Sequence, residues 1–296
     1  MISYRFLRRT VLSCAVGALA LGAAACSGGS EHPPPGRAGR PAASPTAAAT
    51  PTGPPRLAPG PSGLTPVFKS AAGGTGHKAA RERTVALTFD ADMTADQGPR
   101  AAAGEHFDNP RLIGTLRRLK IPATVFMTGR WAEEYPAEAK DIGGDPLFEV
   151  ANHSYSHYAF TGDCYGLPTV PATGMRADVE RAFTAFRKAG VRHVVPYFRF
   201  PGGCYDRQAL RSLTPTGVTA IQWDVVSGDA FATDAGAVTR QVLDGVRPGS
   251  VVVMHCTRSA APTTERVVRD VVPALRAKGY RFVRVSELVG AAARKP

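Results

Sequence analysis

The sequence predicts an α/β domain built on a parallel barrel of about seven strands. Short apolar segments of strand length recur from residue 81 to the C-terminus. Segments with apolar residues at helical spacing lie between them, and this alternation is typical of parallel β/α units. Candidate reactive side chains follow the ends of several of these strands, which is where β/α barrels carry their active sites. A doubly wound sheet would place them similarly and stays the alternative.

The expected elements follow one another in β/α order. In the clearest helix, at 175–189, Val179 and Phe186 fall on one face and Gly190 can end the helix. Pro273 is expected to kink the helix at 264–278. The expected strands are 84–89, 123–127, 147–150, 194–200, 218–223, 250–254 and 281–285, and the other expected helices are 111–120 and 235–243.

The N-terminus has the pattern of an export signal. Arg5, Arg8 and Arg9 precede an apolar run at 11–25, and Cys26 follows it. This order predicts a signal peptide over residues 1–25, and the run is short for a membrane-spanning helix. We expect lipidation of Cys26, which would anchor the protein to the outer side of the cell membrane. Ordinary secretion is the alternative.

Residues 26–80 differ in composition from the rest of the chain. They are rich in Pro, Ala, Gly, Ser and Thr and contain few large apolar residues. Such a segment cannot bury enough surface to offset the entropy lost on ordering, so we expect a disordered linker. Residues 81–290 would then form the catalytic domain.

The formal net charge of +12 is unevenly distributed. Most of the excess lies before residue 81, where Glu31 is the only acid. The predicted domain is therefore only mildly basic. Nucleic acid is a poor partner for an exported protein of this kind, and an anionic cell wall is a better one. We expect a monomer.

Three of the five cysteines lie in the predicted domain. An exported protein can form disulfides, and an odd count leaves one thiol free. Cys256 adjoins His255, a candidate catalytic residue, so we expect Cys164 to pair with Cys204.

Two histidines four residues apart, His153 and His157, follow a predicted strand. Side chains at this spacing can reach one ion if the chain makes a helical turn there. A catalytic zinc site needs a third protein ligand, and the acidic stretch at 88–92 is the obvious supplier. The alternative is a solvated histidine pair in a polar loop.

Five motifs in this order resemble those of the polysaccharide deacetylases of the NodB-homology group, carbohydrate esterase family four. The resemblance covers roughly residues 81–288. The motifs are Thr-Phe-Asp-Ala-Asp at 88–92, His-Ser-Tyr-Ser-His at 153–157, Arg-Phe-Pro-Gly-Gly at 199–203, Trp-Asp-Val-Val-Ser-Gly-Asp at 223–229 and Val-Met-His at 253–255.

The resemblance implies a distorted (β/α) barrel that removes N-acetyl groups from sugars with a divalent metal, usually Zn²⁺. It makes His153 and His157 metal ligands. Asp90 would be the general base that takes a proton from the attacking water, and His255 the general acid that protonates the departing amine. These roles suit an amide, which is a poor electrophile with a poor leaving group.

The same resemblance assigns supporting roles. Arg199 would orient Asp90, and Asp229 would pair with His255. The Gly202 backbone N–H would stabilise the oxyanion. Val253 would line the acetyl pocket, and Phe200 and Phe231 would contact the substrate.

The first and fourth motifs depart from the family pattern. Family members have two adjacent aspartates in the first motif, and the second binds the metal. Ala91 stands in that place here, and Asp92 follows it. We expect Asp92 to be the third metal ligand, with Asp96 or a water as alternatives. Ala230 replaces an aromatic residue of the fourth motif, with Phe231 next.

The predicted function is N-deacetylation of an acetylated cell-wall polysaccharide, with peptidoglycan favoured over chitin-like chains. A carbohydrate O-deacetylase of the acetylxylan esterase type is one alternative. The other is a non-catalytic wall-binding lipoprotein that has lost its metal through the change at Ala91.

Overall fold

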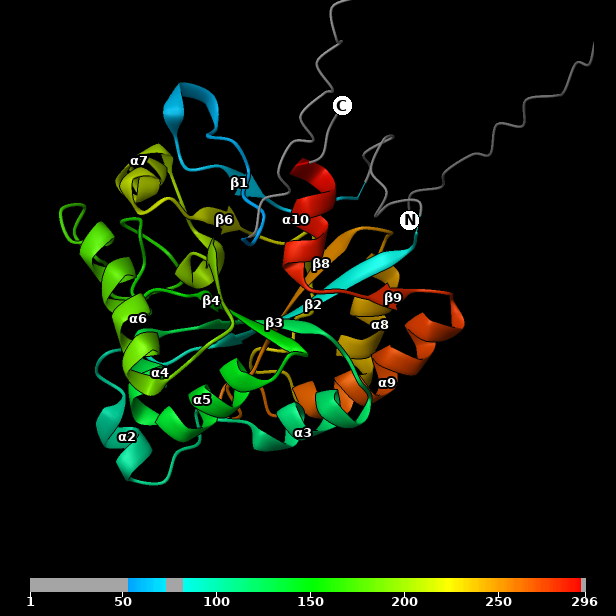
Figure 1. The fold of residues 1–296 in the computed structure, drawn as a ribbon. Helices are drawn as coiled ribbons and strands as arrows, with labels where there is room; N and C mark the ends of the chain where they lie inside the picture. The colour runs from blue at the N-terminus through cyan, green and yellow to red at the C-terminus, as the bar shows by residue number, and fades with distance from the viewer. Residues whose placement is uncertain (1–52, 73–81, 294–296) are drawn as a thin grey trace, which may run out of the picture. The chain divides into compact units, whose positions relative to one another are not determined.

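A sheet whose strand pairings are all parallel forms the centre of the fold (Figure 1). The computed structural model describes residues 53–72 and 82–293. Its nine strands run in the order β1-β6-β5-β4-β3-β2-β8-β7, with β9 on β2. They are β1 (Val67–Phe68), β2 (Thr84–Ala91), β3 (Ala123–Met127), β4 (Phe148–Asn152), β5 (Val194–Phe198), β6 (Thr219–Ile221), β7 (Val225–Val226), β8 (Ser250–His255) and β9 (Arg281–Phe282).

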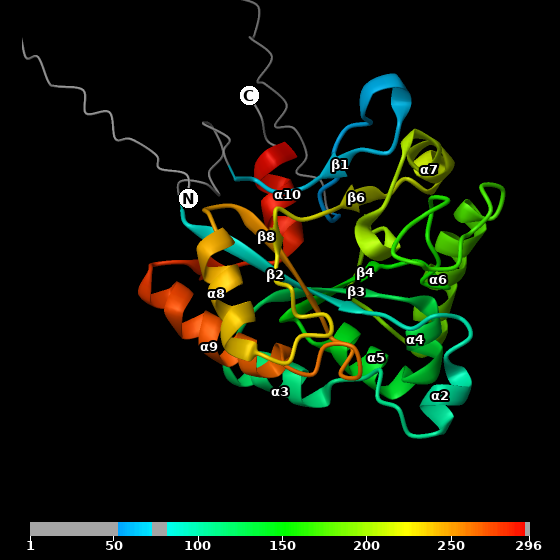
Figure 2. The same ribbon diagram turned by 180° about the vertical axis from the view of Figure 1, so that it is seen from behind.

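The strands form a half-barrel, which matches the distorted (β/α) barrel that the sequence predicts, with short strands added to the expected set. Figures 1 and 2 show α3, α5 and α9 along one side of the strands and α10 on the other. The helices are α2 (Gly98–Ala102), α3 (Pro110–Arg118), α4 (Gly129–Glu134), α5 (Pro136–Gly144), α6 (Met175–Ala189), α7 (Arg207–Leu213), α8 (Ala235–Gly245), α9 (Thr264–Ala277) and α10 (Val285–Ala293).

Local sequence explains where the helices begin and end. Asn109 accepts a hydrogen bond from the Leu112 N–H, and Pro110 occupies the first turn of α3. The predicted helix at 175–189 is α6, and Gly190 ends it in the left-handed conformation at φ 79°. Helix α9 continues through Pro273 as one element.

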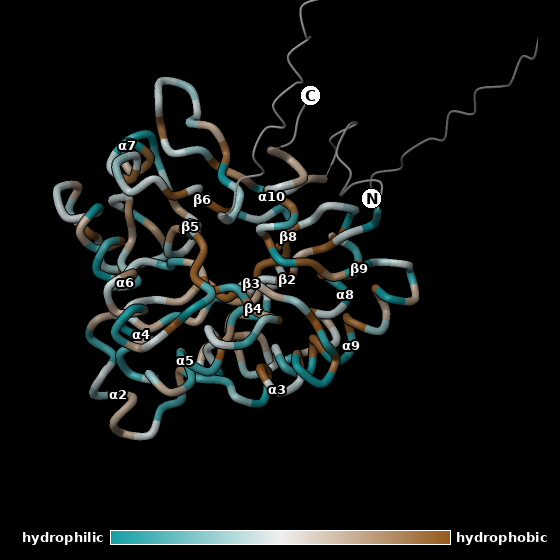
Figure 3. The backbone as a smooth tube through the Cα atoms, in the orientation of Figure 1, coloured by the Kyte–Doolittle hydropathy of each residue, from teal (hydrophilic) through white to brown (hydrophobic). Residues whose placement is uncertain are grey.

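Strand β2 lies between two hydrophobic clusters. Val85, Leu87 and Phe89 pack into the cluster that includes α3 and α9, whereas Ala86 belongs to the cluster closed by α10. Side chains alternate between the two faces of a strand, so Asp90 shares the face of Ala86. The most hydrophobic backbone lies along the central strands in Figure 3. A carboxylate is therefore carried near the end of a fully buried strand.

Part of the predicted disordered linker belongs to the folded domain. β1 pairs with β6, matching Val67 to Ala220. Phe68 is only 5% exposed, and the Arg56 guanidinium donates to the Gly217 carbonyl at 3.0 Å. The expectation of disorder is wrong for residues 53–72, because a few apolar side chains and the unpaired edge of β6 are enough to order the segment.

The other N-terminal expectations fall on the chain outside the described ranges. The signal peptide, Cys26, and linker residues 27–52 and 73–80 all lie there. Within residues 53–72 and 82–293, no helix has the length and apolar character needed to cross a membrane.

Candidate active site

The polar residues of the motifs meet at the carboxyl ends of the central strands. Asp90 of β2 is the register partner of His255 on β8. The amide N–H of Cys256 donates to the Asp90 carbonyl at 2.7 Å, which fixes the two strand ends side by side. A cleft of about 560 Å³ opens above them and is lined by Asp90, Asp92, His153, His157 and His255.

Asp90 is held by a buried arginine. The Arg199 guanidinium is fully buried, and its Nη1 donates to Asp90 Oδ1 at 2.6 Å. Its Nε donates to the Ile221 carbonyl, and the guanidinium lies 3.8 Å from the centre of the Phe126 ring. Because Oδ1 is committed to Arg199, Oδ2 is the Asp90 oxygen that faces His153, at 3.7 Å from Nε2.

The two histidines of the second motif stand close together, with ring centres 4.9 Å apart. His153 Nδ1 lies 2.9 Å from the Arg199 carbonyl oxygen. A carbonyl can only accept a hydrogen bond, so Nδ1 carries the proton and Nε2 presents its lone pair to the cleft. His157 has a left-handed backbone at φ 57°, and its N–H donates to Ser154 Oγ at 2.9 Å. The chain therefore turns sharply rather than continuing into a helix.

Asp92 faces the second histidine. Its Oδ2 lies 3.5 Å from His157 Nε2. Thr257 donates its hydroxyl proton to Asp92 Oδ1, and the Asp92 N–H donates to Thr257 Oγ1 at 3.2 Å. Asp96, the alternative third ligand, is exposed and does not line this cleft.

The ionisation states of these groups are set mainly by burial. Burial lowers the pKa of His153, and it lowers that of His157 to about 4, so both imidazoles are neutral at neutral pH. Burial opposes ionisation of Asp92, but attraction to a protonated imidazole at His157 or His255 and the Thr257 hydroxyl outweigh it and lower the pKa of Asp92. Two neutral histidines and an ionised carboxylate are the forms that bind a divalent metal.

These donors suit a metal ion in their chemistry. The carbonyl bond to His153 Nδ1 is the kind of outer contact that orients metal-binding histidines. In the part of the chain that the structure describes, no three His, Cys, Asp or Glu side chains are already gathered as a complete metal site. Asp90 with His153 and Asp92 with His157 are thus two facing pairs around one space.

His255 is held by a second carboxylate. Its Nδ1 lies 2.8 Å from Asp229 Oδ1, and its backbone N–H donates to Asp229 Oδ2 at 2.8 Å. Ser227 and Thr264 also donate to this carboxylate, at 2.8 and 2.6 Å. Burial opposes a charge on His255, but the bond to Asp229 and its negative charge outweigh it and raise the pKa to about 9. His255 is therefore a cation at neutral pH.

Residues 77–221 match the family model described as polysaccharide deacetylase. The chain is thus similar to the polysaccharide deacetylases over about half of its length. The match includes the first three motifs, while Asp229 and His255 lie beyond it.

Curated relatives and solved structures extend the similarity. A chitooligosaccharide deacetylase from Sinorhizobium fredii is 29% identical over 202 residues, which cover 64% of this chain and 86% of that protein. A peptidoglycan-N-acetylglucosamine deacetylase from Bacillus cereus is 28% identical over 201 residues, covering 67% and 66%. The solved peptidoglycan N-acetylglucosamine deacetylase Bc1960 has the same fold, with a TM-score of 0.61 at 24% identity over 76% of this chain and 92% of that one.

A glycine turn borders the cleft. Pro201–Gly203 forms a single 3₁₀ turn, with Gly202 at φ 63°. A Cβ on Gly202 would lie 2.6 Å from Cys164 Sγ, and one on Gly203 would lie 2.5 Å from the Trp223 ring. The turn is thus enclosed on both sides, and neither position accepts a side chain without rearrangement.

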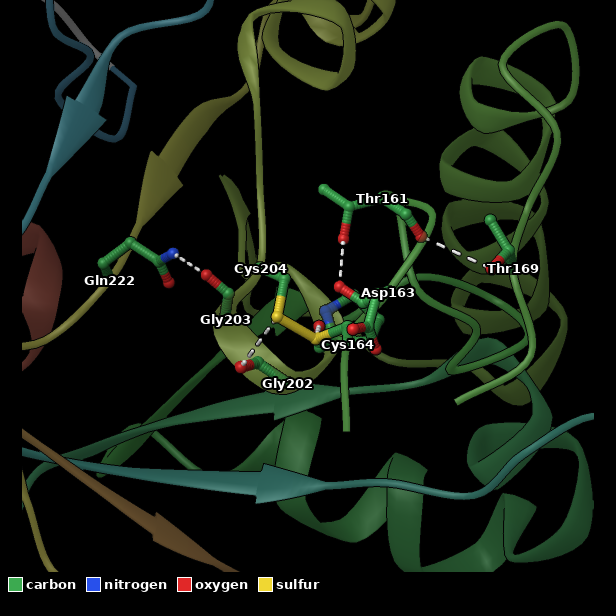
Figure 4. The surroundings of a disulfide bond; sticks show 9 residues. Thr161, Asp163, Cys164, Thr169, Gly202, Gly203, Cys204 and Gln222 are labelled. Carbon is green, nitrogen blue, oxygen red and sulfur yellow. Dashed lines mark hydrogen bonds between the residues drawn. A yellow bond between two sulfur atoms is a disulfide. The ribbon is translucent and has the colours of Figure 1, made fainter. Parts of the chain in front are cut away.

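The structure contains the Cys164–Cys204 disulfide (Figure 4). It joins the loop between β4 and α6 to the residue that follows the glycine turn. Gln222 Nε2 donates to the Gly203 carbonyl at 2.7 Å and holds the turn from the other side. Cys256, the third cysteine of the predicted domain, is buried and free.

The expected substrate contacts divide into two groups. Val253 and Phe231 line the cleft. Phe200 is fully buried and packs against Phe160, Phe198 and Tyr205. The expectation that Phe200 contacts substrate is therefore wrong, because its side chain points into an aromatic cluster.

Other residues of the cleft carry no motif in the sequence. Thr257 hydrogen-bonds Asp92, and Tyr165 lines a wall of the cleft. Thr257 lies two residues after His255, and this position near a strand end indicates that its side chain can reach the site. Tyr165 lies in a long loop next to the disulfide-bonded Cys164, and no local pattern in the sequence indicates that it lines the cleft.

Proposed function

We propose that this chain is a metal-dependent polysaccharide N-deacetylase. The observation that carries the proposal is the pair of held groups across one cleft, Asp90 bound by Arg199 and His255 bound by Asp229. A carboxylate with one free oxygen and a cationic imidazole are a general base and a general acid. Peptidoglycan is the favoured substrate and chitin-like chains are the next, in line with the relatives' names.

His153, His157 and Asp92 would hold the metal, with zinc proposed because imidazole and carboxylate ligands suit it. When bound there, the ion would polarise the acetyl carbonyl and lower the pKa of water at the site.

The chain's own residues would move the protons. Asp90 Oδ2 takes a proton from the attacking water as the new C–O bond forms, while Arg199 keeps Oδ1 in place. His255 Nε2 gives its proton to the sugar nitrogen as the C–N bond breaks, because Nδ1 is engaged by Asp229. The products are acetate and a free amino sugar. The Gly202 N–H is proposed to stabilise the oxyanion.

We also propose that the protein is exported, with Cys26 lipidated and the domain tethered near the cell wall. The support is the basic and apolar pattern before Cys26. Mass spectrometry of the membrane fraction would detect the diacylglyceryl cysteine. A mature N-terminus at another residue in the culture medium would instead indicate ordinary secretion.

The test uses the full-length chain with three acetylated substrates and measures released acetate. We expect acetate release from an N-acetylglucosamine pentamer or from peptidoglycan. The release should be lost in Asp90→Asn. It should also be lost when a chelator removes the metal, and it should return when Zn²⁺ is added. Release from acetylated xylan alone would identify the O-deacetylase. Absence of release from every substrate, with retained glycan binding, would identify the non-catalytic wall-binding protein.

A further inference from the structure

Three large apolar side chains are exposed among residues 53–72 and 82–293, and all three line the same cleft. They are Tyr165, Phe231 and Val226, with exposures of 87%, 83% and 52%. Exposed apolar side chains that gather at one concave site indicate a binding surface. Tyr165 has no role in the proposed proton transfers.

Both exposed aromatic residues have a backbone conformation that bulky residues avoid. Tyr165 has φ 51° and Phe231 has φ 59°. A left-handed conformation is strained at such residues, and it persists where the surroundings impose it. The Phe231 N–H donates to the Ala260 carbonyl at 2.6 Å, which holds one of them.

The disulfide and the glycine turn hold the other. Cys164, the neighbour of Tyr165, is bonded to Cys204. The Leu167 N–H donates to the Cys164 carbonyl at 3.0 Å and closes the loop around Tyr165. A Cβ on Gly202 would lie 3.3 Å from Tyr165 Cδ2, so the edge of the ring rests on the turn. The rest of the ring is open to the cleft.

We propose that Tyr165 determines specificity by stacking on a sugar ring adjacent to the acetylated one, and that the Cys164–Cys204 disulfide positions it. This rests on the proposed function, because the acetylated sugar must lie over Asp90 and His255. A pyranose ring presents an apolar face of C–H groups, which an exposed aromatic ring can cover. The preferred ligand is then an extended glycan chain rather than a single sugar.

The test measures binding, and the full-length chain carries Asp90→Asn so that the ligand is not consumed. The probes are N-acetylglucosamine and its β-1,4-linked pentamer. Tyr165→Asn removes the ring and suits a left-handed backbone, and Tyr165→Phe keeps the ring as the matched control. We expect Tyr165→Asn to weaken pentamer binding about tenfold, which is about 1.4 kcal/mol. Monosaccharide binding should stay within about twofold of the parent.

Cys204→Ser tests the positioning role. It should produce the same selective loss for the pentamer, because the loop is no longer tied to the turn. Three results would overturn the specificity role of Tyr165. They are unchanged pentamer affinity in Tyr165→Asn, an equal loss of affinity for both ligands, and a parent that binds no pentamer. Full pentamer affinity in Cys204→Ser would overturn the role of the disulfide. The two proposals can fail separately. If pentamer binding depends on Tyr165 but the chain with Asp90 intact releases no acetate, this inference is supported and the proposed deacetylation is not.

Discussion

Asp229 holds His255 at two points, through the imidazole Nδ1 and through the backbone N–H, each at 2.8 Å. One carboxylate therefore holds the imidazole ring and the strand end that carries it, and it favours the positive charge of the ring. We expect Asp229→Asn to lower kcat by about 10²- to 10⁴-fold, because a neutral amide no longer favours the protonated imidazole.

Steady-state acetate release checks this expectation. Asp224→Asn is the matched control, since the Asp224 carboxylate bonds Ser250 and Val251 away from the cleft. A kcat in Asp229→Asn equal to that of the control would remove His255 from the role of acid.

Loss of Arg199 should destabilise the fold as well as the site. Arg199→Met leaves Asp90 as an unpaired buried carboxylate, and breaking a buried ion pair in this way costs about 3–5 kcal/mol of unfolding free energy. Urea unfolding measures the loss. The double variant Arg199→Met with Asp90→Asn should recover part of it, and a double variant as unstable as the single one would contradict this account.

Thr257 should tune metal binding through Asp92. Thr257→Val removes the hydroxyl that donates to Asp92 Oδ1 while keeping the side-chain shape. Substitution of such outer contacts weakens metal affinity by about 10- to 100-fold. Competition with a zinc chelator measures the change. Thr263→Val, at a hydroxyl outside the cleft, is the control, and equal affinities in the two variants would contradict the prediction.

The folded domain should begin near residue 53 rather than at Arg81. A chain that starts at 81 lacks β1 and the buried Phe68, and burial of one such side chain contributes about 1.5–3 kcal/mol. We expect it to melt at a lower temperature than a chain that starts at Gly53. Phe68→Ala in the longer chain should reproduce part of the loss. Equal melting temperatures for both chains would show that β1 is dispensable.

Glu138 should make stability depend on pH outside the cleft. Its burial, together with the charges of Asp108 and Asp141, raises its pKa to about 7. The folded state then holds a proton that the unfolded state releases near pH 4.5, so this contribution is present at low pH and is lost as pH rises through 7. Glu138→Gln should melt higher than the wild type at pH 8, with a smaller difference at pH 5. A difference independent of pH would contradict this assignment.

Local patterns in the sequence were enough to predict the β/α order, because buried parallel strands and amphipathic helices leave periodic apolar signals. They also predicted Asp90, Arg199, Asp229 and His255 as residues of one site, since parallel strands bring their carboxyl ends to one edge. Each of these residues follows or ends an apolar strand.

Contacts between distant segments decided the rest. The pairing of β1 with β6 spans about half of the chain, so composition alone suggested a linker there. Asp92 rather than Asp96 faces His157 because Thr257 of another loop bonds it. Phe200 turns into the core, and the disulfide brings Tyr165 to the cleft. Side-chain direction in loops depends on the tertiary surroundings, which leave no periodic trace in the sequence.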